Sequence, residues 1–371
     1  MLPALMCART ARAAAPAPEL EEAGGEAGGL QALAALALRA ATAARNLVGD
    51  ALGSGGAAAA SPMPFAPLCA GGEVSVYRGS WEPPTGGGGA DGAYVTVPRG
   101  PCAGAPELPL VILHHGFMVP ASWMQPYAEL IAGFGGFAVA AYDGANFVPD
   151  SIVAYDWLGP FVAWVLERER AGALGLPPGY SIDAGGIGVI GHSRGGNIAA
   201  LQLNATGAAA VVRGGYLIDP VGCGTRFAAC GEGADGALDV GAYRAGWTAV
   251  AQAGSRVWMT AAAELSSFND AACACAERRL DAEGLCPVLL GVSCDDVVQN
   301  RLFFDAAAPP SVRYTLEGAE HWSFLRQPYI NRTSATAIAW LVDRVRGEAR
   351  FLEDAYRQAV GANGTVVDRR A

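Results

Sequence analysis

A glycine-bounded serine motif constrains the fold of this chain more than any other feature. Residues 191–195 read G-H-S-R-G, directly after the apolar run 186–190 and before a helix-compatible stretch at 197–203. A serine at a sharp turn from strand to helix takes a strained backbone conformation, and glycines on either side let the two elements approach closely. Such motifs are common by chance in a chain with 50 glycines. The flanking pattern nevertheless favours a strand–turn–helix unit.

This unit resembles the nucleophile turn of α/β-hydrolases. The resemblance implies that Ser193 is a nucleophile whose hydroxyl is exposed at the carboxyl edge of a parallel sheet. The family's chain order places the general base after the last strand, and of the four histidines only His321 stands there. We therefore expect His321 to take the serine proton and return it to the leaving alcohol. His192 is expected to point away from the nucleophile on steric grounds.

A second loop in the sequence has the composition of an oxyanion site. The apolar run 110–113 leads into H-H-G-F at residues 114–117. In α/β-hydrolases this loop donates one backbone N–H to the oxyanion, and the residue after the nucleophile donates the other. We expect Phe117 and Arg194 to supply these donors, with His114 and His115 shaping the loop.

The acid that would orient the base has two candidates. Asp219 follows the predicted strand 216–218, and Asp295 follows the predicted strand 287–292. Either carboxylate can reach a histidine that follows the last strand, so spacing alone leaves both open.

The hydrophobic pattern alternates between strand and helix periods from residue 72 onward and predicts an α/β fold. Eight strands with intervening helices imply a mostly parallel eight-stranded sheet with helices on both faces, the α/β-hydrolase fold. The composition, 52% hydrophobic and 16% charged, suits a well-buried parallel sheet. The predicted strands are 73–77, 93–97, 108–113, 137–142, 186–190, 216–218, 287–292 and 312–316, and the predicted helices lie near 122–134, 152–173, 197–204, 299–306 and 333–358.

Composition also divides the chain into three parts. Residues 1–70 are rich in alanine and glycine and form a low-complexity extension, which is either a chloroplast-type transit peptide or a disordered segment. Residues 71–360 form the expected catalytic domain, and 361–371 a flexible tail. A formal charge of −10 argues against a nucleic-acid partner. No segment is apolar enough to be a transmembrane helix.

The cysteine pattern is not that of a metal site. The nine cysteines include no repeated C-x-x-C pair, so we expect no structural zinc. Five of them lie within residues 223–286, which predicts one or two disulfides in that stretch. The sequence leaves open which of these cysteines pair. These five are Cys223, Cys230, Cys273, Cys275 and Cys286.

Two longer motifs resemble the chlorophyllases within the α/β-hydrolases. Residues 191–196 read G-H-S-R-G-G and residues 218–221 read I-D-P-V, and both match the family's pattern, as does H-G-F at 115–117. The resemblance implies a triad of Ser193, Asp219 and His321 that hydrolyses chlorophyll to chlorophyllide and phytol without a cofactor. It also implies a chloroplast location and peripheral association with thylakoids.

A substrate with a macrocycle and a phytyl chain needs a broad apolar cleft. Four apolar side chains near the expected site suit that role, although core packing would explain about half of the apolar residues there. They are Met118, Trp123, Phe147 and Trp157.

Two other function classes remain open on the sequence. Residues 294–297 read C-D-D-V and resemble the acid-bearing strand end of cutinases, which would favour Asp295 and a carboxylesterase of the cutinase, lipase or acetylhydrolase kind. A non-catalytic binding protein of the same fold is the third interpretation. An intact serine, histidine and carboxylate set argues against it.

Overall fold

The computed structural model describes most of the chain from residue 63 onward. The described residues are 63–84, 92–104, 106–116, 119–143, 157–203, 212–220, 257–262, 304, 307, 311–316, 319, 321–348 and 365–370. In 257–262 and 365–370 only the backbone is described.

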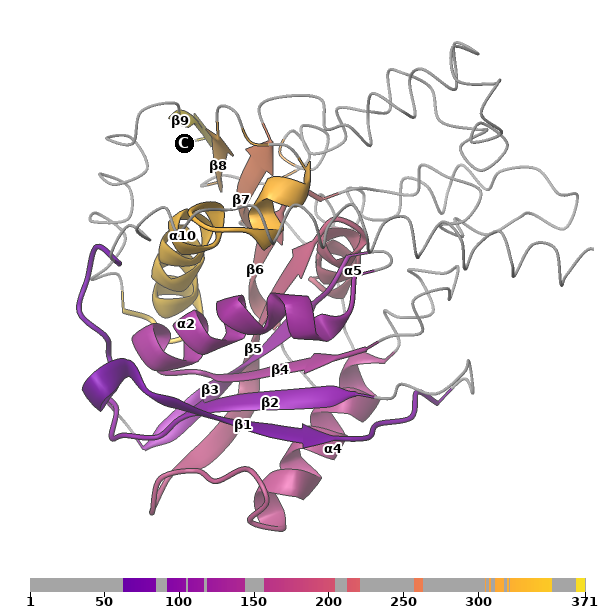
Figure 1. The fold of residues 1–371 in the computed structure, drawn as a ribbon, viewed down its shortest axis with the longest axis vertical. Helices are drawn as coiled ribbons and strands as arrows, with labels where there is room; N and C mark the ends of the chain where they lie inside the picture. Colours follow the sequence, from indigo (N-terminus) through magenta and orange to yellow (C-terminus); the bar gives the residue numbers. More distant parts are fainter. Residues whose placement is uncertain are drawn as a thin grey trace, which may run out of the picture. The chain divides into compact units, whose positions relative to one another are not determined.

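One twisted sheet organises these residues, with the strand order β1-β2-β4-β3-β5-β6-β7-β8-β9. Six neighbouring strands from β4 to β8 are parallel, while β1 pairs with β2, β2 with β4 and β8 with β9 in antiparallel fashion. Figure 1 shows these strands side by side, from β1 at one edge of the sheet to β9 at the other. The strands are β1 (Val74–Gly79), β2 (Ala93–Pro98), β3 (Glu107–His114), β4 (Ala138–Tyr142), β5 (Ser181–His192), β6 (Val212–Ile218), β7 (Val257–Ala262), β8 (Ser311–Leu316) and β9 (Thr365–Arg370).

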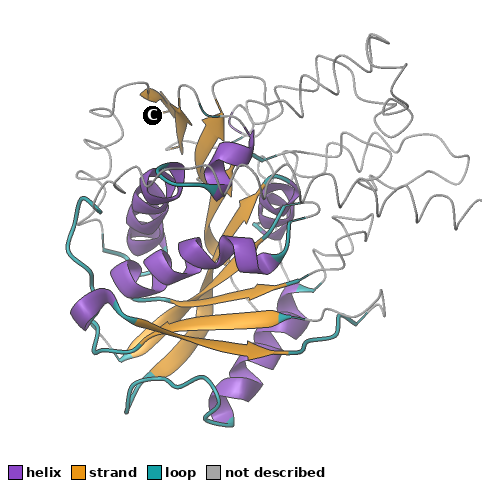
Figure 2. Cartoon of the chain, viewed as in Figure 1, coloured by secondary structure: helices purple, strands orange, loops and turns teal. Residues whose placement is uncertain are grey.

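Helices cover both faces of the sheet, as Figure 2 shows. Alternate residues of β3 point into two separate cores: Val111 and Leu113 pack with helices α2 and α10, whereas Ile112 packs with α4 and α5. This alternation is the period of a strand buried on both sides. The helical elements are α2 (Gln125–Gly135), α4 (Leu158–Arg170), α5 (Arg194–Gln202), α10 (Tyr329–Arg344), and the short turns η1 (Ala70–Gly72), η2 (Ala121–Met124) and η5 (His321–Leu325).

This architecture confirms the predicted fold class, with two differences in its strands. The place beside β6 belongs to β7 (Val257–Ala262), which pairs with β6 on one side and β8 on the other. The prediction that 287–292 is the next strand along is therefore wrong for this position, and 287–292 itself lies outside the described residues. Both runs are short and apolar, so periodicity could not choose between them.

The second difference concerns the carboxyl end of the chain. Residues 365–370 form β9, antiparallel to β8, where a flexible tail was predicted. The described part of the sheet thus contains nine strands in place of eight. A six-residue strand with two valines between polar residues gives too weak a pattern to distinguish it from a tail.

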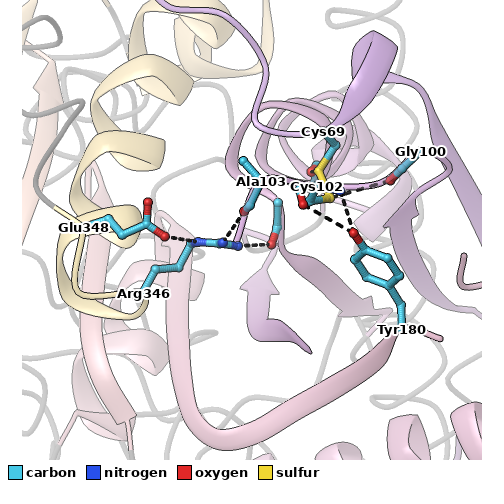
Figure 3. Close-up of a disulfide and its surroundings, with 9 residues drawn as sticks. Cys69, Gly100, Cys102, Ala103, Tyr180, Arg346 and Glu348 are labelled. Atoms are coloured by element: carbon cyan, nitrogen blue, oxygen red, sulfur yellow. Dashed lines mark hydrogen bonds and ion pairs between the residues drawn. A yellow bond between two sulfur atoms is a disulfide. The ribbon is translucent and has the colours of Figure 1, made fainter. Parts of the chain in front are cut away.

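The folded domain also begins earlier than residue 71. Leu68 and Cys69 are buried, and the Leu68 N–H donates to the Phe134 carbonyl at 3.0 Å. A disulfide joins Cys69 to Cys102 (Figure 3). Residues 68–70 are thus part of the packed unit, and the predicted boundary falls inside it.

This disulfide was not among the predicted ones. The Tyr180 hydroxyl accepts a hydrogen bond from the Cys102 N–H at 2.8 Å, and the Arg346 guanidinium donates to the carbonyls of Ala103 and Gly136 at 2.9 Å each (Figure 3). The bridge and these bonds tie together five segments that are distant in the sequence. The five cysteines from 223 to 286 lie outside the described residues.

Candidate active site

The serine motif folds as a sharp turn between β5 and α5. Ser193 has φ 58° and ψ −124°, and α5 begins at the next residue. Its N–H donates to the Ile218 carbonyl at 3.0 Å, and its own carbonyl accepts from the Gly196 N–H at 2.9 Å. A positive φ at a non-glycine residue costs on the order of 1–3 kcal/mol and needs support from its surroundings. These two bonds are part of that support, and they fix the serine beside the end of β6.

Two glycines of the motif leave no room for a side chain. A Cβ at Gly191 would collide with the Gly195 backbone, and a Cβ at Gly195 would collide with the carbonyl oxygens of His114 and His115. The first contact closes the turn on itself. The second brings the start of α5 against the loop that follows β3. The glycine spacing of the motif therefore has a steric cause, as expected from the sequence.

A carboxylate and an imidazole meet beside this turn. The His321 Nδ1 atom lies 2.6 Å from the Asp219 Oδ2 atom, and the two side chains are only 3% and 4% exposed. Asp219 directly follows β6, and His321 opens η5 after β8. Asp219 also has a positive φ, 41°, and it shares this property only with Ser193 among the described non-glycine residues.

The structure bonds two of the three residues that the chlorophyllase resemblance selected, Asp219 and His321, and places the backbone of Ser193 beside them. Ser193 is tied to the last residue of β6, Asp219 is the next residue after it, and His321 is bonded to Asp219. The competing acid, Asp295, lies outside the described residues. Because His321 Nδ1 bonds to a carboxylate, this nitrogen carries the hydrogen and Nε2 carries the basic lone pair.

The three other histidines are buried and neutral. Burial lowers the pKa of His114 to about 4, and it lowers those of His115 and His192 to about 3. Hydrogen bonds hold two of them at the end of β3 and in the loop after it. His114, the last residue of β3, has its Nε2 atom 2.7 Å from the Gln202 Oε1, and His115 Nδ1 donates to the Gly116 carbonyl at 2.8 Å. These bonds fit the expected role of His114 and His115 as residues that shape the loop.

One of the two expected oxyanion donors lies in the described part of the chain. Arg194 is the first residue of α5, so its backbone N–H lies in the first turn of the helix, at the end that follows the serine turn. The loop after β3 approaches the same point, because a Cβ at Gly116 would lie 3.2 Å from the Cβ of Ser193. Phe117, the second expected donor, lies outside the described residues.

The four expected substrate-binding side chains have different placements. Trp123, on η2, is partly exposed and packs against the core on the α2 side of the sheet. Trp157 is 2% exposed and packs with Trp81 and Tyr142 in the opposite core, which agrees with core packing as its role. Met118 and Phe147 lie outside the described residues.

Two residues near the site were not selected from the sequence. Asp143 follows β4 and accepts a hydrogen bond from the Ala121 N–H, which holds η2 at the carboxyl edge of the sheet. Tyr127 on α2 donates its hydroxyl to the Phe324 carbonyl at 2.7 Å and so holds the turn that carries His321. Asp143 could have been found as an acidic residue at a strand end. Tyr127 could not, because its partner is 197 residues away.

Within the described residues, no cluster of histidine, cysteine or carboxylate side chains has the arrangement of a metal site. None of the helices in the same ranges is long and apolar enough to cross a bilayer.

Comparison with known proteins agrees with this fold. The model of the alpha/beta hydrolase family matches residues 111–330, which is more than half of the chain and includes the serine turn, Asp219 and His321. No curated protein matches the chain. Family membership supports a hydrolase, and the sheet order with its mostly parallel strands is consistent with this family's fold. The chain belongs to the alpha/beta hydrolase family.

Proposed function

We propose that this protein is a serine carboxylic-ester hydrolase with Ser193 as nucleophile, His321 as general base and Asp219 as the carboxylate that orients the base. The observation that carries the proposal is the 2.6 Å bond between His321 Nδ1 and Asp219 Oδ2 beside the strained serine turn. A hydrogen-bonded carboxylate fixes both the tautomer and the direction of the imidazole, and this is what a base needs to accept the serine proton.

The reaction follows from these positions. The Ser193 oxygen attacks the ester carbonyl while its proton passes to His321 Nε2, and the carbonyl oxygen becomes an oxyanion. The backbone N–H groups of Arg194 and Phe117 would hold that oxyanion. The intermediate expels the alcohol, which takes the proton from His321. Water then repeats the sequence on the acyl-enzyme and releases the acid.

The surroundings of Asp219 and His321 suit this transfer of a proton to and from the imidazole. Asp219 and His321 are nearly inaccessible to solvent, so the attraction between the carboxylate and the imidazolium that forms is weakly screened. The neighbouring His192 is neutral because burial lowers its pKa to about 3. No second imidazolium therefore opposes the positive charge on His321 at neutral pH.

The substrate that we propose is chlorophyll, cleaved at its propionate ester to chlorophyllide and phytol. Support comes from the two chlorophyllase-like motifs, G-H-S-R-G-G at 191–196 and I-D-P-V at 218–221. The two motifs touch: a Cβ at Gly196 would lie 2.9 Å from the Cβ of Pro220. Their residue types therefore constrain one another at a single site. With this substrate go the proposed chloroplast location and peripheral association with thylakoids.

Two assays in parallel test the proposal. A fluorophosphonate probe should label the wild-type protein and leave Ser193→Ala unlabelled, because only an activated serine reacts readily. Chlorophyll a and p-nitrophenyl butyrate are then offered separately. Chlorophyll hydrolysis should move the pigment from hexane into aqueous acetone with unchanged absorbance, since the ester is remote from the conjugated ring.

The outcomes separate the alternatives. Turnover of p-nitrophenyl butyrate without any pigment transfer would refute the chlorophyll substrate and favour a general carboxylesterase of the cutinase or lipase kind. Absence of labelling and of turnover on both esters would refute the hydrolytic mechanism and favour a binding protein of this fold.

A further inference from the structure

His192 is a buried histidine beside the nucleophile that the proposed mechanism does not use. It is the last residue of β5, it is fully buried, and its Nε2 atom lies 3.0 Å from the backbone carbonyl oxygen of His321. A carbonyl oxygen only accepts hydrogen bonds, so Nε2 must carry the hydrogen. Because burial keeps the ring neutral, Nδ1 carries the lone pair. The bond therefore fixes one tautomer of His192.

The ring of His192 also forms one wall of the turn that carries the base. Its centroid lies 4.7 Å from that of His321 at an interplanar angle of 30°. The rings of Trp322 and Phe324 lie 6.5 Å and 6.3 Å away. All three neighbours belong to η5. His192 thus contacts this short turn both through a hydrogen bond and through ring packing.

Two carbonyl groups of η5 are held by side chains from other elements. His192 from β5 holds the carbonyl of His321, and Tyr127 from α2 holds that of Phe324 at 2.7 Å. A turn of five residues has few backbone bonds of its own, so its position depends on such contacts. Of the two side chains, His192 bonds to the residue that carries the imidazole itself.

We propose that His192 is a positioning residue that holds the His321 backbone, so that the imidazole is aligned between Asp219 and Ser193. His192, which holds the backbone of the base His321, is adjacent to Ser193 in the chain. Any shift of the turn at Ser193 therefore moves the serine and His192 together. The opposite edge of the ring faces the loop after β3, since a Cβ at Gly116 would lie 3.1 Å from His192 Nδ1. The catalytic consequence of this inference rests on the proposed function.

Two substitutions separate the hydrogen bond from the ring. His192→Phe keeps a planar ring and removes the donor, while His192→Gln removes the ring and keeps an N–H donor at the end of the side chain. We expect His192→Phe to lower kcat about 10²-fold on p-nitrophenyl butyrate with KM changed less than about twofold, because a misplaced base slows the chemistry and leaves substrate binding intact. His192→Gln should recover kcat to within about tenfold of wild type.

Trp340→Phe is the matched control for losing one buried N–H donor. Its Nε1 atom donates to the Gly215 carbonyl at 2.9 Å, away from the serine turn. We expect Trp340→Phe to lose about as much stability as His192→Phe and to keep the kcat of the wild-type protein. If His192→Phe behaves like this control, or if His192→Gln is as slow as His192→Phe, the positioning role is refuted.

NMR keeps the test independent of activity, and the first of the two measurements needs only the wild-type protein. Nitrogen NMR of the histidine rings at pH 7 should show His192 neutral, with hydrogen on Nε2 and none on Nδ1. The His321 Nδ1 proton should resonate far downfield because it bonds to a carboxylate, and it should move in His192→Phe but not in Trp340→Phe. The other tautomer of His192 would overturn the inference even if the protein hydrolyses esters. The expected spectrum from a protein without esterase activity would overturn only the proposed function.

Discussion

Acidification from pH 8 to pH 5 should destabilise this protein through its three buried neutral histidines. His114, His115 and His192 have native pKa values of about 4, 3 and 3, against about 6.5 in an unfolded chain. Between these values the unfolded chain binds protons that the native state does not, so stability rises with pH. This contribution to stability is complete above about pH 6.5. It is lost as the pH falls to about 4 for His114 and to about 3 for His115 and His192. Each histidine accounts for about 2 kcal/mol at pH 5, about 6 kcal/mol in all.

Such a loss is comparable to the whole stability of an ordinary domain, about 5–15 kcal/mol, and is readily measured by urea denaturation at several pH values. Carboxylates titrate in part of the same window, so a matched variant is needed. In the wild-type protein, His115 Nδ1 donates to the Gly116 carbonyl at 2.8 Å. His115→Asn keeps an N–H donor for this carbonyl and removes one titrating ring. This variant should lose about 2 kcal/mol less than wild type between pH 8 and pH 5. Parallel stability–pH curves for the two proteins would refute the reasoning.

Four further predictions concern Ser193, the acid, Gly195 of the serine turn and the disulfide. Ser193→Ala should lower kcat for ester hydrolysis by several orders of magnitude without unfolding the protein. Asp219→Asn should lower kcat at least about 10²-fold, whereas Asp295→Asn should lower it less than about tenfold. If Asp295→Asn is the slower variant, Asp295 and not Asp219 is the acid. Gly195→Ala should lower the free energy of unfolding by about 1–3 kcal/mol, because its methyl group meets two backbone carbonyls, and wild-type urea stability would contradict this. Cys102→Ser should lower the same quantity by about 2–4 kcal/mol, because the bridge joins residues 33 positions apart. A reductant should destabilise the wild-type protein more than this variant, since the variant has already lost the bridge.

The local structure around Ser193 follows from the residues next to it in the chain. A strand that ends in G-H-S-R-G and continues as a helix has few conformations available, so the turn at Ser193 followed from steric exclusion alone. The alternation of apolar runs likewise predicted the mostly parallel sheet with helices on both faces, because a strand buried on both sides must be apolar throughout. These features depend on residues that are neighbours in the chain.

Which distant residues meet depends on how the whole chain packs. Asp219 and His321 are 102 positions apart, and the pattern that predicted a carboxylate after a strand fitted Asp295 equally well. The same holds for β7, which takes the place expected for 287–292, and for the bridge between Cys69 and Cys102. Periodicity reports how one segment is buried, but it carries no information on which other segment covers it. That choice belongs to the packing of the whole chain.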